Sequence, residues 1–293
     1  MSRVLEPFEY FEPVSLAAAS QLLQTGNTRI MAGGVDLILK LRRRLVSADR
    51  IVSLKKIPGL NYVTTDDEGY LHVGALATMQ QVADHDQVRE SWTALAEGNA
   101  AVGSLQTKRM STVVGNLCVS TPVSDVTPAL FVLGGKFIIV GRDAERIVDA
   151  EDFFTGLGTT VLQPGEIVRE ITLTPTPDNT TSLLLKAAKT HDDISKVCVG
   201  IAVTVNEGLF LDVKIALGAV AVTTVRALEA ETFLRGKAWS DDIIAEAGAI
   251  AAANIDPISD VRSTAAYRAQ LVKVMVRDGL KESVRRLTES EAG

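Results

Sequence analysis

The stretch TRIMAGGVDLILKLRRR, residues 28–44, places two adjacent glycines between a short apolar run and a basic, helix-like segment. The run TRIMA predicts a short buried strand. After the glycines, apolar residues recur at the spacing of one helix face: Leu37, Ile38, Leu41 and Leu45. A strand, a glycine turn and a helix start bring backbone N–H groups and the positive end of a helix dipole together. The stretch therefore indicates either a bare tight turn or an anion site whose natural occupant is a phosphate or pyrophosphate.

The neighbouring sequence continues this mixture of helix and strand. Ser15 is expected to cap a helix that Gly26 ends, and the run RIVSLKKI predicts the next strand. The run GYLHVGAL predicts a further strand, paired in a hairpin around TTDDEG. The first sixty residues are therefore expected to form a small α/β unit.

The middle of the chain is expected to be mixed, and its end mostly helical. Apolar spacing is helical from residue 79 to 102. The stretch STVVGNLCVSTPVSDVTPALFVLGGKFIIVG, residues 111–141, mixes strand-like runs with a polar, proline-marked loop and a short apolar helix. Pro, Thr, Asn and Asp cluster in the linker candidate at 174–182. Beyond it, SLLLKAA, SKVCVGIAVTVN and LFLDVKIALGAVA predict three antiparallel strands, and an Ala-rich helical pattern follows from Val225. Two domains are expected, residues 1–176 and 177–293.

Composition narrows the class of protein. The chain has 293 residues, of which 46% are hydrophobic and 23% charged, so it can bury a core. Its net charge of −6 argues against a nucleic-acid partner held by phosphate contacts. Its two cysteines, Cys118 and Cys198, are too few for a disulfide scaffold or for the four thiolates of an ordinary iron–sulfur cluster. With no apolar signal core and no membrane-length apolar run, we expect a cytoplasmic protein.

A second stretch, TVVGNLCVSTPVSD at residues 112–125, also suits a phosphate-bearing ligand. Gly115 follows an apolar run, and amide, hydroxyl and carboxylate side chains come next: Asn116, Ser120, Thr121, Ser124 and Asp125. Such groups can hydrogen-bond a sugar–phosphate chain, and Asp125 can accept from a ribose or ribityl hydroxyl. An ordinary loop, with Ser124 or Asp125 opening the helix VTPALFVL, explains the same residues equally well.

A third stretch, KAAKTHDDISKV at residues 186–197, lies between two predicted strands. Cations and carboxylates alternate around His191, so the stretch can border a bound ring or form a solvated hairpin loop. The three histidines show no metal-ligand spacing, and no G-x-S-x-G hydrolase motif is present. We therefore predict no metal site and no catalytic acid, base or nucleophile in this chain.

Several stretches, in one collinear order, resemble the flavin subunits of molybdenum hydroxylases, the family of xanthine dehydrogenase and carbon monoxide dehydrogenase. AGGVDLILKLR is similar to the family's A-G-G-T-D-L loop, and GSLQTKRMSTVVGNLCVSTPVSDVTPAL to its G-G-N segment. FFTGLGTTVLQPGEIVREI, THDDISKVCVGIAV and ALGAVAVTTVRALEAETFLRGK also match family segments. The resemblance covers nearly the whole chain, and several motifs in order are more specific than any one.

The resemblance implies an α+β fold. It predicts a two-lobed FAD-binding domain of the vanillyl-alcohol-oxidase (PCMH) type, with lobes of about 1–57 and 58–176. A small C-terminal domain, residues 177–293, would follow, with a three-stranded antiparallel sheet and a helical bundle.

The resemblance also implies the residues that contact FAD. Backbone N–H groups of two segments would wrap the pyrophosphate: Ala32, Gly33, Gly34, Val35, Asp36 and Leu37, and Thr112, Val114, Gly115 and Asn116. Thr121 and Asp125 would contact the flavin chain or ring, and Ile167 or Val168 would line the ring. Lys186 would lie near the polar edge of the ring, and Asp192 and Asp193 in the loop that borders it. Val35 stands where the family usually has Thr, and Val114 replaces the first Gly of G-G-N.

The implied role is electron transfer. A molybdopterin-binding large subunit would oxidise the substrate, and a [2Fe–2S] small subunit would pass the electrons to FAD in this chain. NAD, a quinone or oxygen would then accept them, in a complex expected to be a dimer of heterotrimers. Two alternatives stay open: a stand-alone FAD-dependent oxidoreductase of the same fold, and a flavin-free scaffold, which only Val35 and Val114 support.

Overall fold

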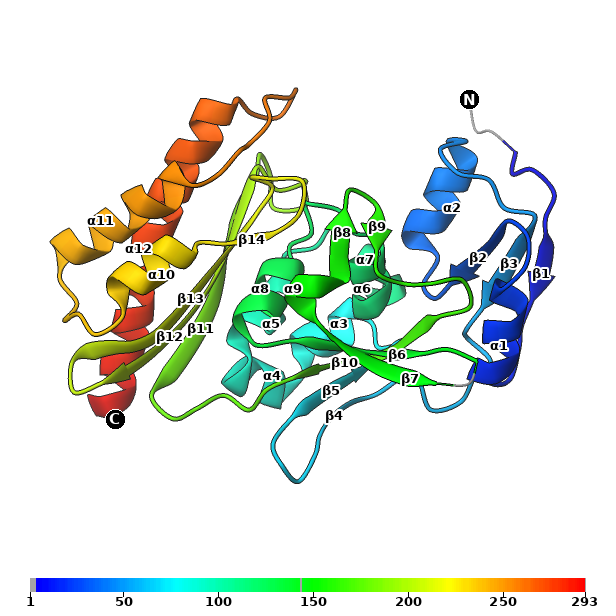
Figure 1. Cartoon of the computed structure of the whole chain (residues 1–293), viewed down its shortest axis with the longest axis horizontal. Helices are drawn as coiled ribbons and strands as arrows, with labels where there is room; N and C mark the ends of the chain where they lie inside the picture. The colour runs from blue at the N-terminus through cyan, green and yellow to red at the C-terminus, as the bar shows by residue number, and fades with distance from the viewer. Residues whose placement is uncertain (1–3, 143, 293) are drawn as a thin grey trace.

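Three α/β units lie side by side along the long axis of the molecule (Figure 1). The computed structural model describes residues 4–142 and 144–292. The chain passes from an N-terminal lobe through a central unit to a C-terminal domain, and each unit has its own sheet. The fold is therefore mixed α and β, as the sequence predicts.

The N-terminal lobe is a three-stranded parallel sheet in the order β1-β3-β2 with two helices. Its elements are β1 (Glu9–Phe11), α1 (Leu16–Leu23), β2 (Thr28–Met31), α2 (Val35–Arg42) and β3 (Arg50–Ser53). The predicted order of helix, strand, turn, helix and strand is confirmed, and Ser15 caps α1 through the backbone N–H of Ala18. Strand β1 was not predicted, because three residues are too few for an alternating pattern to show.

Two expectations for the opening stretch are wrong. Strand β2 is not buried, since it lies at the sheet edge and the side chain of Ile30 is 39% exposed. Helix α2 ends at Arg42, and Arg44 has a left-handed backbone with φ of 57°. Leu45 therefore lies outside the helix face on which its spacing placed it, and it is exposed.

The central unit is a five-stranded antiparallel sheet in the order β4-β5-β10-β6-β7. The predicted hairpin around TTDDEG is confirmed as β4 and β5. The strands of this sheet are β4 (Val63–Thr65), β5 (Leu71–Gly74), β6 (Lys136–Val140), β7 (Glu145–Asp149) and β10 (Ile167–Leu173). A separate small hairpin is formed by β8 (Phe154–Gly156) and β9 (Thr159–Thr160).

Short helices pack against this sheet around one core. They are α3 (Met79–Asp84), α4 (Asp86–Ser91), α5 (Thr93–Ala100), α6 (Leu105–Met110), α7 (Val113–Cys118), α8 (Thr127–Val132) and α9 (Ala150–Phe153). Within the mixed stretch of residues 111–141, the expected strand and short helix are present as β6 and α8. Its first apolar run is not a strand, because Thr112 caps α7 there and buried packing outweighs the strand preference of valine.

The C-terminal domain is a sheet covered by three helices. Its elements are β11 (Thr180–Ala187), β12 (Val197–Asn206), β13 (Leu209–Gly218), β14 (Val225–Arg226), α10 (Leu228–Leu234), α11 (Asp241–Ala253) and α12 (Ala265–Ala292). The three predicted strands are confirmed, but β14 makes the sheet four-stranded. Two residues carry no detectable pattern, so the sequence reading missed this strand.

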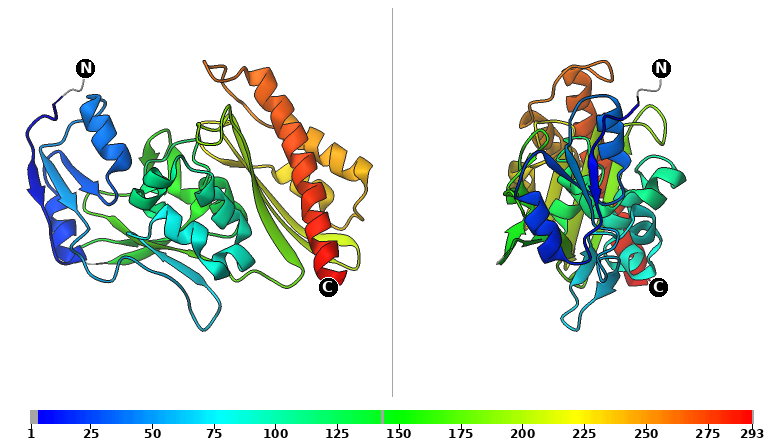
Figure 2. Two further views of the ribbon diagram at one scale, coloured as in Figure 1. Left: turned by 180° about the vertical axis from the view of Figure 1, so that it is seen from behind. Right: turned by 90° about the vertical axis from the view of Figure 1, so that its right-hand side faces the viewer.

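The C-terminal sheet also packs directly on the central unit. A Cβ atom on Gly200 would lie 2.7 Å from the carbonyl oxygen of Pro128 in α8, so only glycine allows this approach. Cys198, Ala202 and Ala216 on the same face join the core of the central unit. The opposite face of the sheet carries α10, α11 and α12 (Figure 2). The C-terminal domain therefore packs on the central unit, which contains the second predicted loop at residues 112–125.

Candidate functional site

The two glycine-containing stretches meet in space, although about eighty residues separate them. A Cβ atom on Gly33 would lie 2.0 Å from the carbonyl oxygen of Met110, so a larger residue would push the two loops apart. A Cβ atom on Gly115 would lie 2.6 Å from Thr112 Oγ1 and 3.9 Å from the Ala32 Cβ. The structure therefore brings segment 32–37 against segment 110–116.

The first of these segments presents an uncapped helix start. Gly34 is the N-cap of α2 with φ of 78°, a left-handed conformation that favours glycine, and it has no side-chain oxygen to offer. Within the described part of the chain, no side chain caps this turn. The N–H groups of Val35, Asp36 and Leu37 begin the helix and have no partner within it. An anion is the natural acceptor for such a group of donors.

Helix α2 itself is only partly buried. It has no buried residue, and Lys40 pairs with Asp36 at 2.8 Å on its exposed surface. The side chain of the neighbouring strand β2 that lies next to the helix start is Met31, whose sulfur would be 3.0 Å from a Cβ atom on Gly34. Apolar surface next to free anion donors is the combination that a dinucleotide with an aromatic ring and a pyrophosphate needs.

The second segment is self-capped. Thr112 Oγ1 accepts a 3.1 Å hydrogen bond from the Gly115 N–H, which closes the first turn of α7. Asn116 Oδ1 accepts from Ser124 Oγ at 2.9 Å, so the amide fixes the loop that follows. Val114 is 4% exposed and packs in the core. Where the family has glycine, the valine side chain at position 114 therefore points into the core and does not cover the surface that faces segment 32–37.

The loop between α7 and α8 is held from two directions. Ser124 Oγ accepts from the backbone N–H groups of Val126 and Thr127 at 3.3 Å. The N-cap of α8 is Val126, so neither Ser124 nor Asp125 is the cap residue, although Ser124 binds the N–H groups at the helix start. Ser120 has φ of 50° and donates to the carbonyl oxygens of Gly156 and Thr159 at 2.9 Å. Thr121 lies between these anchors and is half-buried.

Asp125 and Lys186 form a buried ion pair between the central unit and the C-terminal domain. Lys186 Nζ donates to Asp125 Oδ2 at 2.8 Å and to the Ala101 carbonyl oxygen at 2.8 Å. Ser195 Oγ donates a short hydrogen bond to Asp125 Oδ1. Burial raises the pKa of the Asp125 carboxyl, and the hydrogen bonds from Lys186 and Ser195 offset part of that rise. Both carboxylate oxygens thus already have protein partners.

The remaining candidates fall in two different environments. Ile167 and Val168 are 1% and 3% exposed and belong to the core under β10. Asp192 and Asp193 lie in the β11–β12 loop. Asp192 pairs with His191 at 3.0 Å, and the side chains of His191 and Asp192 are exposed. The structure does not bring these four residues into contact with segment 32–37.

Sequence reasoning overlooked Ser195 and Met110. Ser195 stands in the third quoted stretch, but its partner is 70 residues away, and no local pattern marks a single inward-facing serine. Met110 takes part through its backbone carbonyl, which any residue could supply. Only the glycine at position 33 signalled a close approach.

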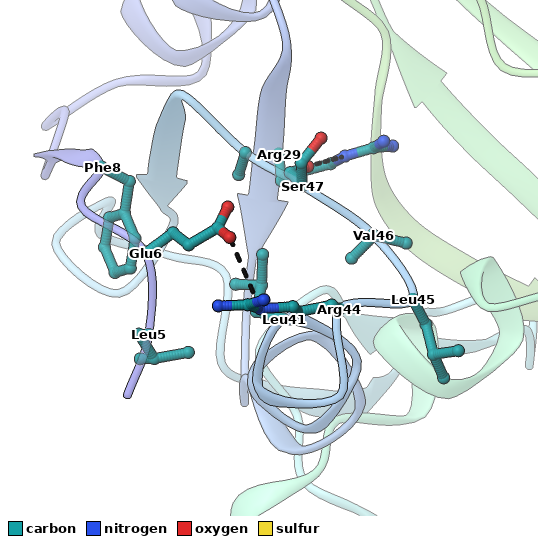
Figure 3. Close-up of a pocket in the computed structure, with 10 residues that line it drawn as sticks. Leu5, Glu6, Phe8, Arg29, Leu41, Arg44, Leu45, Val46 and Ser47 are labelled. Atoms are coloured by element: carbon teal, nitrogen blue, oxygen red, sulfur yellow. Dashed lines mark hydrogen bonds and ion pairs between the residues drawn. The ribbon is translucent and has the colours of Figure 1, made fainter. Parts of the chain in front are cut away.

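A separate pocket of about 480 Å³ lies elsewhere on the N-terminal lobe (Figure 3). Its rim carries the Glu6–Arg44 ion pair at 3.5 Å, and Arg29 Nε donates to the Ser47 carbonyl oxygen at 3.2 Å. None of the candidate residues lines this pocket. It is therefore not the site that the two loops form.

One class of architecture is excluded for the described residues: none of their helices is both long and apolar enough to cross a membrane.

Comparison with known proteins gives the family. Residues 6–177 match the FAD binding domain in molybdopterin dehydrogenase, and residues 184–283 match the CO dehydrogenase flavoprotein C-terminal domain. The chain is 31% identical to the glyceraldehyde dehydrogenase medium chain of Sulfolobus acidocaldarius, over 94% of this chain and 98% of the relative. It is 28% identical to the carbon monoxide dehydrogenase medium chain of Afipia carboxidovorans, over 94% and 96% of the two chains.

The fold comparison agrees. A chain of a solved Cu,Mo-CO dehydrogenase superposes with a TM-score of 0.92 and 27% identity, covering 97% of this chain and 99% of that one. The chain belongs to the family of FAD-binding medium subunits of molybdopterin dehydrogenases, and it is the flavin-binding oxidoreductase subunit of a molybdenum hydroxylase-type complex.

Proposed function

We propose that this chain binds one FAD across the contact between segments 32–37 and 110–116, and passes electrons from a [2Fe–2S] partner to an external acceptor. The observation that carries the proposal is the uncapped start of α2, held against the second loop by the close approach of Gly33 to Met110. The fold would be the two-lobed PCMH type, with a domain boundary near residue 177.

The pyrophosphate would lie at the start of α2. Backbone N–H groups of Val35, Asp36 and Leu37 supply neutral donors there, and the helix dipole adds a favourable field for a doubly charged group. On the other side, Gly115 keeps the surface free of a Cβ atom. The loops would thus hold the diphosphate without any cationic side chain.

The flavin ring would lie toward the C-terminal domain, near the loop that carries Thr121 and Asp125. Since Asp125 is paired with Lys186 and Ser195, its main task would be to fix this loop and the charge beside it. Ile167 or Val168 would form the apolar floor, and the loop of Asp192 and Asp193 would border the ring. FAD supplies the redox chemistry, and the chain orients it and sets its electrostatic surroundings.

The complex would contain a molybdopterin-binding large subunit and a [2Fe–2S] small subunit, in a cytoplasmic dimer of heterotrimers. The relatives named above are medium chains, and this chain covers nearly their full length, which supports a subunit of the same kind. NAD, a quinone and oxygen are the acceptor classes to be tested, and the substrate would bind on the large subunit.

The first experiment is a visible spectrum of the purified chain after incubation with FAD and gel filtration. The proposal expects flavin absorbance bands at about one FAD per chain. A spectrum without flavin, even at excess FAD, would overturn it and favour a flavin-free scaffold.

The second experiment is affinity purification from the native host, with metal and iron analysis of the bound material. The proposal expects molybdenum and iron to co-purify on two partner chains. A lone flavoprotein that oxidises its own substrate would instead establish the stand-alone oxidoreductase.

A further inference from the structure

Arg268, in the first turn of α12, is a buried arginine that the sequence analysis did not single out. Its side chain is about 3% exposed. One guanidinium nitrogen donates a short hydrogen bond to the Lys196 carbonyl oxygen and a 3.2 Å bond to the Ala219 carbonyl oxygen. The other donates to Asp260 Oδ1 at 2.8 Å. The planar fork of Arg268 therefore joins three separate segments.

Asp260 is itself anchored, so it holds the guanidinium in a fixed place. Its Oδ1 atom accepts from the backbone N–H groups of Arg262 and Ser263 at 2.9 and 3.0 Å. Asp260 precedes α12 in the loop that follows α11. The loop and the helix start thus form one rigid support for Arg268.

Both carbonyl groups that Arg268 holds lie next to contacts with the proposed flavin loop. Lys196 follows Ser195, whose hydroxyl donates to Asp125. The N–H of Ala219 donates to the Pro122 carbonyl oxygen at 2.7 Å, and Ala219 has a left-handed φ of 63°. An alanine in that conformation stays there only when its surroundings enforce it.

We propose that Arg268 is a positioning residue for the flavin site: from the C-terminal domain it fixes the loop of residues 120–126 through Ser195 and Ala219. The inference rests on the proposed function, because it assumes that this loop contacts FAD. Removing the guanidinium would leave the carbonyl groups of Lys196 and Ala219 without this donor, while Asp260 would keep its two backbone N–H donors. Lysine cannot replace it fully, since a single ammonium lacks the planar fork that reaches all three acceptors.

Arg286 provides a matched control on the same helix. It lies near the other end of α12, which runs the height of the C-terminal domain (Figure 2). It also joins the domain to the central unit, through Glu97 Oε1 in α5 at 3.0 Å, and it donates to the Ser182 carbonyl oxygen of β11 within the domain at 3.3 Å. Its hydrogen bonds within the described residues go to Glu282, Ser182 and Glu97, and none of these lies in the 120–126 loop or next to Lys196 or Ala219.

The experiment compares the full-length wild type, Arg268→Met, Arg268→Lys and Arg286→Met. Hydrogen–deuterium exchange of the FAD-free chain is measured at residues 120–126, and the FAD dissociation constant and flavin midpoint potential are measured after loading. For Arg268→Met we expect exchange at the loop and the FAD dissociation constant to rise about tenfold, with a shifted potential. Arg268→Lys should lie between this variant and the wild type. Arg286→Met should lower the melting temperature but leave all three readouts unchanged.

Several outcomes would overturn the proposal. Unchanged loop exchange in Arg268→Met, or equal changes in Arg268→Met and Arg286→Met, would reduce Arg268 to a general stabiliser. If Arg268→Met does not fold, Asp260→Asn must shift the same readouts in the same direction by a smaller factor, and its failure to do so contradicts the proposal. If the wild type binds no FAD, the proposed function fails separately, while exchange in the FAD-free chain still decides whether Arg268 positions the loop.

Discussion

The start of α2 and the cluster around Asp125 are two halves of one proposed site, and they are built in opposite ways. At α2, the first-turn N–H groups have no capping side chain, and the helix has no buried residue. Around Asp125, both carboxylate oxygens are paired, and the side chains of Asp125 and Lys186 are 7% and 11% exposed. The first half has donors available to a ligand, whereas the second already satisfies its own groups.

This difference separates residues that should determine FAD affinity from residues that should determine the stability of the chain. Donors without protein partners gain hydrogen bonds when an anion arrives, so changes at α2 should act mainly on FAD affinity. A buried ion pair is costly to break whether or not a ligand is present, so changes at Asp125 should act first on the stability of the FAD-free chain. Four predictions test this separation.

The largest effect is expected for Asp125→Ala. The substitution leaves the Lys186 ammonium buried without its carboxylate, so the FAD-free chain should lose about 3–5 kcal/mol of unfolding free energy. The double variant Asp125→Ala/Lys186→Met should recover part of the loss, because it removes the unpaired charge. Urea unfolding of the FAD-free proteins measures both. A single variant as stable as the wild type would show that the cluster is not structural.

The second effect is expected for Gly33→Ala. The new Cβ would lie 2.0 Å from the Met110 carbonyl oxygen, so the two loops must separate. Strain of about 1–3 kcal/mol should weaken FAD binding by roughly 5- to 150-fold. Gly141→Ala is the control, because its Cβ would meet only ordinary contacts at 3.6 Å or more. FAD titration measures both affinities. Equal affinities of the two variants would show that FAD binding does not depend on the contact between Gly33 and Met110.

A smaller effect, of opposite sign, is expected for Val35→Thr. The added hydroxyl stands in the first turn of α2, where it can donate to a phosphate oxygen. One such hydrogen bond is worth about 1 kcal/mol, so FAD affinity should rise roughly fivefold. Val35→Ala, which adds no donor, should show no such gain. If threonine brings no gain over alanine, the pyrophosphate does not lie at this turn.

The smallest effect, on stability, is expected at a second polar cluster whose side chains hydrogen-bond one another, on the central sheet. His72 contacts Asp66 and Glu170, each at 3.0 Å. Partial burial lowers the pKa of His72, but hydrogen bonds to the two carboxylates more than offset it, so the pKa is raised. The resulting stabilisation is present in full below the unfolded pKa of about 6.5 and is lost as pH rises through the folded pKa.

The stability difference between wild type and His72→Gln should therefore shrink as pH rises above about 6.5, by no more than about 1 kcal/mol. FAD affinity should be the same in both proteins, because His72 is not part of the loops that meet at Gly33. A difference that grows with pH would contradict the assigned sign, and altered affinity would contradict the separation of the two regions.

Local pattern predicted much of the fold. The order of elements in the N-terminal lobe, the β4–β5 hairpin and the three long C-terminal strands follow from apolar periodicity and turn residues. Errors arose where packing decides the outcome. The valines of α7 favour a strand, but the Thr112 cap and burial of Val113 make a helix. The exposure of Ile30 depends on the sheet edge, which periodicity along one strand does not reveal.

The site was predictable only in part. Gly33, Gly34 and Gly115 marked backbone positions with special demands, and the collinear resemblance linked them into one site. Ser195 and Arg268 could not be predicted from the sequence, because their partners lie about 50 to 70 residues away and each acts as a single side chain. Long-range polar contacts of this kind leave no local sequence pattern.

The most direct test of the central claim is titration of the FAD-free chain with FAD, followed by intrinsic fluorescence and the visible spectrum. We predict saturation at one FAD per chain, with weaker binding by Gly33→Ala and wild-type affinity for Gly141→Ala. A chain that takes up no FAD, or that binds it equally well with alanine at position 33, would contradict it.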